Sequence, residues 1–123
     1  MDTNKTILIV DDVEENIAIL ERQLKSQGFT ILSATEGPKG IHMLKEQHID
    51  LVLLDINMPV IDGITLLGYI KEDKVLSHVA VLMVTANDDV KTAMQCLKKG
   101  ACGYITKPYS MEQIKQQIQH CIY

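Results

Sequence analysis

Five polar side chains that could do chemistry together each follow a short apolar run in this sequence. They are Asp11, Asp12, Asp55, Thr85 and Lys107. Short apolar runs of this kind are typical of buried strands. If the runs are parallel strands of one sheet, their carboxyl ends share an edge, and ligands bind at that edge in open parallel sheets. We therefore treat these residues as one candidate site.

The acidic members of this set favour a divalent cation. Asp11, Asp12 and Asp55 would meet in one pocket if the strands that precede them are neighbours. Two like charges 4 Å apart repel by roughly 4 kcal/mol at an effective dielectric constant near 20. A cation relieves this repulsion, and ligands that are all oxygen favour Mg²⁺ or Mn²⁺ over zinc.

A carboxylate beside a metal, a hydroxyl and an ammonium group can accept a phosphoryl group. Asp55 can act as the nucleophile that forms an acyl phosphate. Thr85 can donate a hydrogen bond to a phosphoryl oxygen, and Lys107 can balance the charge of another. The candidate catalytic residues are therefore Asp55, Thr85 and Lys107.

The elements that position this site can be read from the apolar pattern. The unbroken run Leu51–Leu54 predicts a strand covered on both faces, and Pro59 lies in the segment that ends it. In all, strands are predicted at 7–10, 29–34, 51–54, 79–84 and 102–105. Helices are predicted from Asp12 to about Gln27, from Pro38, from Ile64, from Asp88 or Asp89 to Gly100, and from Ser110.

Side-chain spacing predicts how these helices begin and which faces they bury. Asp12 resembles an N-cap, with Glu15 as its capping-box partner. Helical periodicity then predicts the inward residues. These are Val13, Ile17, Leu20 and Leu24 in the first helix; Ile41 and Leu44 in the second; Ile64, Leu67 and Ile70 in the third; Val90, Ala93, Met94 and Leu97 in the fourth; and Met111, Ile114 and Ile118 in the fifth.

Strands that alternate with helices predict an α/β fold with a parallel, doubly wound sheet. The 123 residues suit one domain, 1–123 with a core of about 6–120, and no output domain is expected within it. A net charge of −4 argues against a general nucleic-acid binder. No apolar run approaches the roughly 20 residues of a membrane span, and the first residues do not resemble a signal peptide, so we expect a cytoplasmic protein.

The cysteines give weaker signals. Cys96, Cys102 and Cys121 are odd in number and contain no Cys-x-x-Cys motif, so a disulfide framework is not expected. A zinc site made of these residues and His120 would not match the usual ligand spacing. We expect small buried or surface thiols instead.

The sequence closely resembles the receiver domains of bacterial two-component response regulators, from about Thr6 to Ile118. The residues that carry the resemblance are Ile7-Leu8-Ile9-Val10-Asp11-Asp12, Asp55-Ile56-Asn57-Met58-Pro59 with Asp62-Gly63, Thr85-Ala86, Gly100-Ala101 and Lys107-Pro108. The resemblance implies a flavodoxin-like fold with five strands in the order 2-1-3-4-5 and five helices.

The same resemblance implies a role for each site residue. Asp55 would be the phosphoacceptor, and Asp12 and Asp55 would bind Mg²⁺ together with the backbone carbonyl of Asn57. Asp11 would act through a metal-bound water. Lys107 would hold the phosphoryl group, and its peptide bond to Pro108 would be cis. The only activities implied are Mg²⁺-dependent self-phosphorylation from a donor and autodephosphorylation, so no enzyme acting on another substrate is expected.

The resemblance also implies a switch and its partners. Thr85 would move toward the phosphoryl group, and Tyr104 would turn inward and change the face formed by the helix from Asp89, the strand at 102–105 and the helix from Ser110. The phosphodonor would be a sensor histidine kinase or a histidine phosphotransfer protein, with Asn16 and Ile17 as candidate contacts. The changed face would control a downstream effector or an attached output domain, and a homodimer through it is left open.

Three other interpretations of the sequence compete with a receiver domain. A flavodoxin-type cofactor binder lacks the phosphate-binding loop that it would need after the first strand. An aspartyl phosphatase would need a second acid where Asn57 stands. An inert interaction module would keep the fold without phosphorylation. Within the receiver reading, Asn57 and Asn87 supply no carboxylate to activate water, which predicts a long-lived phosphoryl state.

Overall fold

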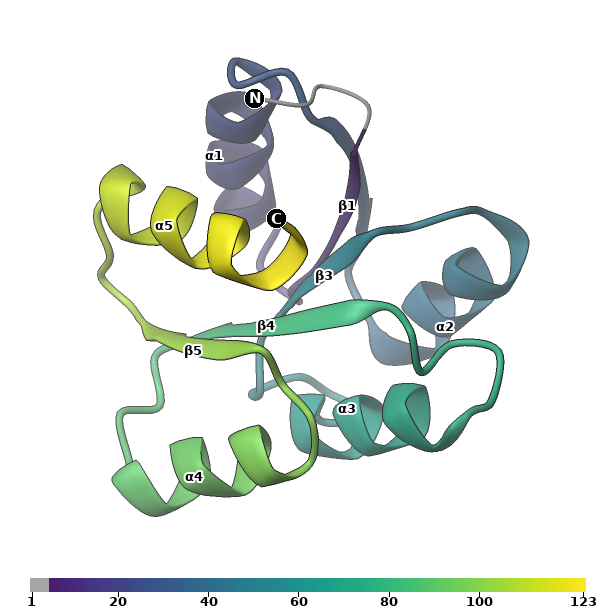
Figure 1. Cartoon of the computed structure of the whole chain (residues 1–123). Coiled ribbons are helices and arrows are strands. Elements are labelled where there is room, and N and C mark those ends of the chain that lie inside the picture. Colours follow the sequence, from purple (N-terminus) through teal and green to yellow (C-terminus); the bar gives the residue numbers. More distant parts are fainter. Residues whose placement is uncertain (1–4) are drawn as a thin grey trace.

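Strands and helices alternate along the whole described chain. The computed structural model describes residues 5–123, shown in Figure 1. The strands are β1 (Thr6–Val10), β2 (Thr30–Ala34), β3 (Leu51–Leu54), β4 (Ala80–Thr85) and β5 (Gly103–Thr106). The helices are α1 (Glu14–Lys25), α2 (Gly37–Glu46), α3 (Gly63–Glu72), α4 (Val90–Lys98) and α5 (Met111–Ile122). The predicted elements are thus all present, with ends that differ by a few residues.

The strands form one parallel sheet in the order β2-β1-β3-β4-β5, which confirms the predicted topology. The register places Val10 beside Leu54, and Leu54 beside Met83. The carboxyl ends of β1 and β3 therefore lie together near the centre of the sheet. The strand order reverses at this point, which is where ligands bind in doubly wound sheets.

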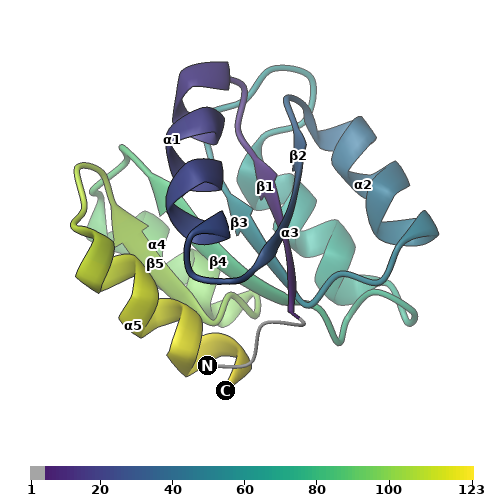
Figure 2. The ribbon, with the colours of Figure 1, turned by 90° about the horizontal axis from the view of Figure 1, so that it is seen from above.

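The sheet divides the core into two layers because successive strand residues point to opposite faces. On one face Leu8, Val10, Val52 and Leu54 pack with residues of α2, α3 and α4. On the other face Ile7, Ile9, Leu51 and Leu53 pack with residues of α1 and α5. Figure 2 shows α1 and α5 together on one side of the sheet and α2 and α3 on the other. Strands covered on both faces explain why β1 and β3 are apolar without interruption.

The helix starts are partly as predicted. Asp89 caps α4 and Ser110 caps α5, the latter with a full capping box through Gln113. The predicted N-cap at Asp12 is wrong, because α1 begins after Val13 and that residue has no side-chain cap. The Asp11 carboxylate instead accepts a hydrogen bond from the Val13 amide. The turn after β1 is one residue longer than the capping-box pattern indicated, and Val13 lies outside the core.

The predicted inward face of α4 is also wrong. Val90, Met94 and Leu97 are 71%, 54% and 48% exposed, whereas Cys96 is fully buried. Ala93 is half-buried, so α4 is rotated relative to the predicted stripe. The prediction placed four apolar residues at helical spacing on one face, but α4 packs against the core through Cys96 instead. The exposed apolar row becomes a surface feature of the molecule.

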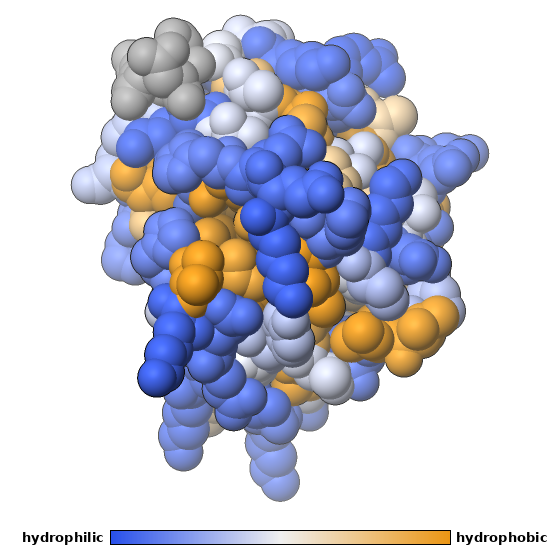
Figure 3. Space-filling model, turned by 90° about the vertical axis from the view of Figure 1, so that its right-hand side faces the viewer, coloured by the Kyte–Doolittle hydropathy of each residue, from blue (hydrophilic) through white to orange (hydrophobic). Residues whose placement is uncertain are grey.

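The surface is mostly polar on the side where α2 lies. Figure 3 shows hydrophilic side chains over most of this face, with hydrophobic ones in small separate groups. Single exposed apolar residues of this kind are ordinary on folded proteins. Within residues 5–123, no helix combines the length and the apolar character needed to cross a bilayer.

Candidate functional site: a carboxylate cluster with a bridging lysine

Three carboxylates meet at the carboxyl ends of β1 and β3. One oxygen each from Asp11, Asp12 and Asp55 lies within 4.8 Å of the others. Asp11 and Asp55 are buried, with 3% and 7% of their surface exposed, and Asp12 is exposed. The register of β1 and β3 produces this cluster, because the Asp55 amide donates to the carbonyl of Val10. The predicted acidic set is thus assembled.

Lys107 bridges the two buried carboxylates. Its Nζ lies 3.0 Å from Asp11 Oδ2 and 3.4 Å from Asp55 Oδ2. Burial alone would lower the pKa of this ammonium group, but the hydrogen bonds and charges of Asp11 and Asp55 outweigh it and raise the pKa above its ordinary value. Lys107 therefore remains charged at neutral pH and partly balances the two acids. Its bond to Pro108 is cis, as predicted.

Asp11 is held by more partners than the sequence indicated. Besides Lys107, its Oδ2 accepts from Asn16 Nδ2 at 3.3 Å, and its Oδ1 accepts from the Val13 amide at 2.9 Å. Asn16 follows Asp11 by five residues and lies in the first turn of α1. That turn begins directly above the strand end, so an amide here reaches back to the site. Because Asp11 lies in the turn before α1, helical periodicity does not predict this contact.

Thr85 and Tyr104 meet at Asn87. Thr85 is the last residue of β4 and is fully buried, and its hydroxyl accepts from the Asn87 amide at 3.3 Å. The half-buried Tyr104 donates its hydroxyl hydrogen to the Asn87 carbonyl at 2.7 Å. Both side chains therefore hold the loop between β4 and α4. This contact links the predicted switch pair through a shared backbone segment.

Tyr104 gives a prediction for the alkaline range. Burial, with further effects from nearby acidic groups, raises the pKa of Tyr104 to about 12. Because the folded-state pKa lies above the unfolded value near 10, the stability from this hydroxyl is present below pH 10 and is lost as pH rises through about 12. We expect the tyrosinate absorbance that Tyr104→Phe removes to develop near pH 12. A difference signal centred near pH 10 would contradict this placement.

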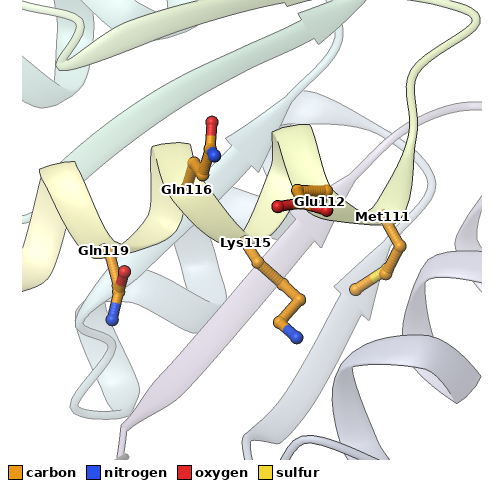
Figure 4. A pocket seen from close by; sticks show the side chains of 5 residues that line it. All are labelled: Met111, Glu112, Lys115, Gln116 and Gln119. Atoms are coloured by element: carbon orange, nitrogen blue, oxygen red, sulfur yellow. The ribbon is translucent and has the colours of Figure 1, made fainter.

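An open groove of about 740 Å³ adjoins the carboxylates. It is lined by Asp12, Val13, Glu14, Glu15, Thr35 and Pro59. A second groove follows the outer side of α5, and Figure 4 shows that its five labelled side chains all come from that helix. The α5 groove contains none of the predicted site residues, whereas the groove beside Asp12 gives access to the cluster.

The donor set suits a hard cation. Three carboxylates supply only oxygen, and Mg²⁺ takes few protein oxygens and keeps several waters. Within residues 5–123, the structure brings together one group of acids, histidines or cysteines that could hold a metal ion, and it is this one. The zinc alternative with Cys96, Cys102, His120 and Cys121 therefore has no support.

Asn57 lies two residues after Asp55 and is exposed at the surface. Its backbone amide donates a hydrogen bond to Asp55 Oδ1 at 3.3 Å.

Comparison with known proteins identifies the family of this chain. Residues 7–119 match the model of the response regulator receiver domain. The chain belongs to this family. It is therefore a receiver domain of the two-component signalling systems, as the resemblance predicted.

Curated relatives of this receiver domain differ in length. CheY-3 of Vibrio cholerae is 35% identical, over 96% of this chain and 92% of the relative. The response regulator PleD of Caulobacter vibrioides is 36% identical over 83% of this chain, but the match spans 22% of PleD. PhoP of Bacillus subtilis is 30% identical, and the match spans 48% of it. The chain thus covers well under two thirds of several relatives.

Solved structures agree with the fold. A CheY structure from Borrelia burgdorferi, described as a CheX–CheY–BeF3–Mg²⁺ complex, has a TM-score of 0.88 at 34% identity and covers 94% of this chain and 87% of that one. A response regulator structure from Chloroflexus aurantiacus has a TM-score of 0.89 at 26% identity and covers 94% of this chain and 95% of that one. The receiver domain fold predicted from the sequence is confirmed.

Proposed function

We propose that this receiver domain accepts a phosphoryl group on Asp55 from a phosphohistidine. The donor would be a sensor histidine kinase or a histidine phosphotransfer protein. The observation that carries the proposal is the bridging of Asp11 and Asp55 by Lys107, beside an exposed third carboxylate and an open groove. An inert interaction module would have no need of two buried acids sharing one lysine.

Asp11, Asp12, Asp55 and the carbonyl of Asn57 would hold Mg²⁺, with Mn²⁺ as a substitute. When bound, the ion would neutralise phosphoryl oxygens. The support for this assignment is the oxygen-only donor set within 4.8 Å. It is also consistent with the Mg²⁺ in the described complex of the Borrelia burgdorferi relative. Asp11, already held by Lys107, Asn16 and Val13, suits the indirect contact through water.

In the transfer step, a carboxylate oxygen of Asp55 forms the new bond to phosphorus while the bond from phosphorus to the donor's imidazole nitrogen breaks. The imidazole keeps the bonding electrons and takes a proton from solvent. Lys107 already points at Asp55 Oδ2 and would pair with a phosphoryl oxygen as its charge increases. Asp55, Thr85 and Lys107 are the proposed catalytic residues, acting on the protein itself and on no other substrate.

Phosphorylation would be read out through Thr85 and Tyr104. The Thr85 hydroxyl would turn from the Asn87 amide toward the phosphoryl group. Tyr104 holds the carbonyl of Asn87, so movement of this loop would reach the face of α4, β5 and α5. The exposed apolar row of α4 belongs to that face. An effector, an output domain or a second copy of the chain would bind there, in the cytoplasm.

The predicted kinase contacts need one correction. Ile17 is buried, with 6% of its surface exposed, so it packs in the core rather than meeting a partner. Asn16 is half-buried and bonded to Asp11. Ile19, one turn further along α1, is 49% exposed and lines a groove with Lys107 and Pro108. We propose Asn16 and Ile19 as the donor-facing residues of α1.

The test is phosphorylation by acetyl phosphate with Mg²⁺, read by intact mass. The wild type should gain one phosphoryl group and the Asp55→Asn variant none, because the amide is not a nucleophile. Asp50→Asn is a matched control, since Asp50 accepts hydrogen bonds from Thr6 and His48 away from the site. If the wild type gains no phosphoryl group from acetyl phosphate or from any of a panel of phosphorylated kinases, the inert interaction module is the remaining interpretation.

The lifetime of the acyl phosphate gives a further expectation. Asn57 and Asn87 place amides where a carboxylate could activate water. The Asn87 side-chain oxygen already accepts a hydrogen bond from the backbone amide of Asp89. We expect the phosphoryl group to persist beyond seconds in Mg²⁺ after the donor is removed. Asn57→Asp should shorten the lifetime, measured by intact mass over time. Complete loss within seconds in the wild type would contradict the expectation.

A further inference from the structure

A disulfide joins Cys102 to Cys121, contrary to the expectation of separate thiols. Their Cα atoms lie 5.5 Å apart, within the range that a disulfide needs. Cys102 directly precedes β5, and Cys121 lies in the last turn of α5. Sequence reasoning missed the pair because eighteen residues separate its members, and only the return of α5 along the sheet brings them together, as Figure 1 shows.

We propose that Cys102 and Cys121 form a reversible redox site that sets how firmly α5 is held to the sheet. Both residues are only half-buried. A small thiol or disulfide can therefore reach them, and accessible disulfides are typically the labile and regulatory ones. The site is separate from the carboxylate cluster and does not depend on phosphorylation of Asp55.

The third cysteine does not compete for this chemistry. Cys96 is fully buried and packs with the core on the opposite face of the sheet. Cys102 and Cys121 pack against the core beneath α1 and α5. Burial also raises the pKa of the Cys96 thiol, which keeps it protonated and poorly reactive. Exchange between the bridge and Cys96 is thus disfavoured by position as well as by reactivity.

The reduced form also has a defined place in the structure. Cys102 Sγ lies 3.3 Å from the carbonyl oxygen of Val81, and a free thiol there would donate a hydrogen bond to it. In oxidation, the thiolate of one cysteine would attack a glutathione-type disulfide and release one thiol. The other cysteine would then attack the mixed disulfide and release the second thiol, so two cysteine thiols are oxidised as one small disulfide is reduced.

The bridge encloses functional residues. The closed segment from 102 to 121 contains Tyr104, Lys107 and the whole exposed side of α5. The first turn of α5 is fixed by its capping box, and its middle by the buried Ile114 and Ile118. The last turn is fixed covalently by Cys121. Reduction should therefore loosen this turn first and relax the face of β5 and α5.

The bridge can be tested by alkylation in glutathione buffers of increasing oxidised fraction. After quenching and unfolding, intact mass should show one alkylated cysteine in the oxidised protein and three in the reduced protein. Cys96→Ala should keep a two-group difference, whereas Cys102→Ser and Cys121→Ser should abolish it. Three alkylated groups in every buffer would overturn the proposal, as would a bridge that dithiothreitol cannot open in the folded protein.

Hydrogen exchange tests the structural consequence. Amides in the last turn of α5 should exchange several-fold faster in the reduced protein, while those of the capped first turn change little. The Cys102→Ser variant should behave like the reduced protein in both buffers. Equal hydrogen exchange in the two redox states would contradict the proposal that the bridge holds the last turn of α5. Neither experiment uses a phosphodonor, so a failure here is distinct from a failure of the proposed phosphorylation.

Discussion

Replacing Lys107 with methionine is expected to slow phosphorylation of Asp55 by acetyl phosphate at least about 100-fold. The ammonium group lies 3.0 and 3.4 Å from the carboxylates of Asp11 and Asp55, where charge increases during phosphoryl transfer. Removing a single positioned donor from such a site costs about 100- to 1,000-fold in rate. Methionine keeps most of the side-chain volume, so the loss would report the charge. The measurement is the rate of phosphoprotein formation by intact mass.

The same substitution is expected to destabilise the protein in the absence of divalent cations. It leaves two buried carboxylates without their shared cation, and breaking a buried pair in this way costs about 3–5 kcal/mol. The exposed Lys98 at the end of α4 provides the matched control, and Lys98→Met should change neither quantity appreciably. A wild-type phosphorylation rate in Lys107→Met would show that Lys107 has no role in transfer.

Replacing Gly63 with alanine is expected to destabilise the protein by about 3 kcal/mol, near the upper part of the usual range for overpacking. A Cβ atom at Gly63 would clash with the carbonyl oxygen of Asp55 and would lie 2.7 Å from the Cα of Ile56. Both are backbone atoms, so no side-chain rotation can relieve the contact. The Gly63 amide also donates to the Ile56 carbonyl. Alanine would therefore push α3 away from the phosphoacceptor loop.

Gly68 in the same helix provides the control. A Cβ atom there would meet only Lys99 Nζ at 3.9 Å, which is ordinary contact distance. Gly68→Ala should therefore stabilise the protein by about 0.5–1 kcal/mol, the usual gain in a helix interior. Urea unfolding followed by circular dichroism compares the two variants. Equal stability of both variants would refute the close packing of α3 against Asp55, and Gly63→Ala should also slow phosphorylation.

The sheet and most of the site could be predicted from the sequence because both depend on local patterns. Unbroken apolar runs marked the strands, and alternation with helices required them to be parallel. Parallel strands then placed their end residues on one edge. The approach of Asp11, Asp12 and Asp55 within 4.8 Å confirms this reasoning. The same rule places Lys107 at this edge, but its position between two of these acids comes from the tertiary structure.

Details at the ends and faces of helices were less predictable. Asp12 and Glu15 have the spacing of a capping box, but Asp12 does not cap α1. The carboxylate of the buried Asp11 instead accepts the hydrogen bond from the backbone amide before the helix. In α4 the exposed apolar row faces outward, and Cys96 is the buried residue of this helix. Local spacing gives the period of a helix but not its rotation when several faces are comparably apolar.

The sequence by itself determined the order of elements, the parallel sheet and the acids at its edge, since each follows from local apolar periodicity. Tertiary structure alone decided contacts that no periodicity predicts. It placed Asn16 against Asp11, brought Gly63 against the carbonyl of Asp55, and joined Cys102 to Cys121. The first two contacts depend on the conformation of the turns that lead into α1 and α3, and the third depends on the return of α5 along the sheet. These conformations are set by packing of the whole core, which no local pattern contains.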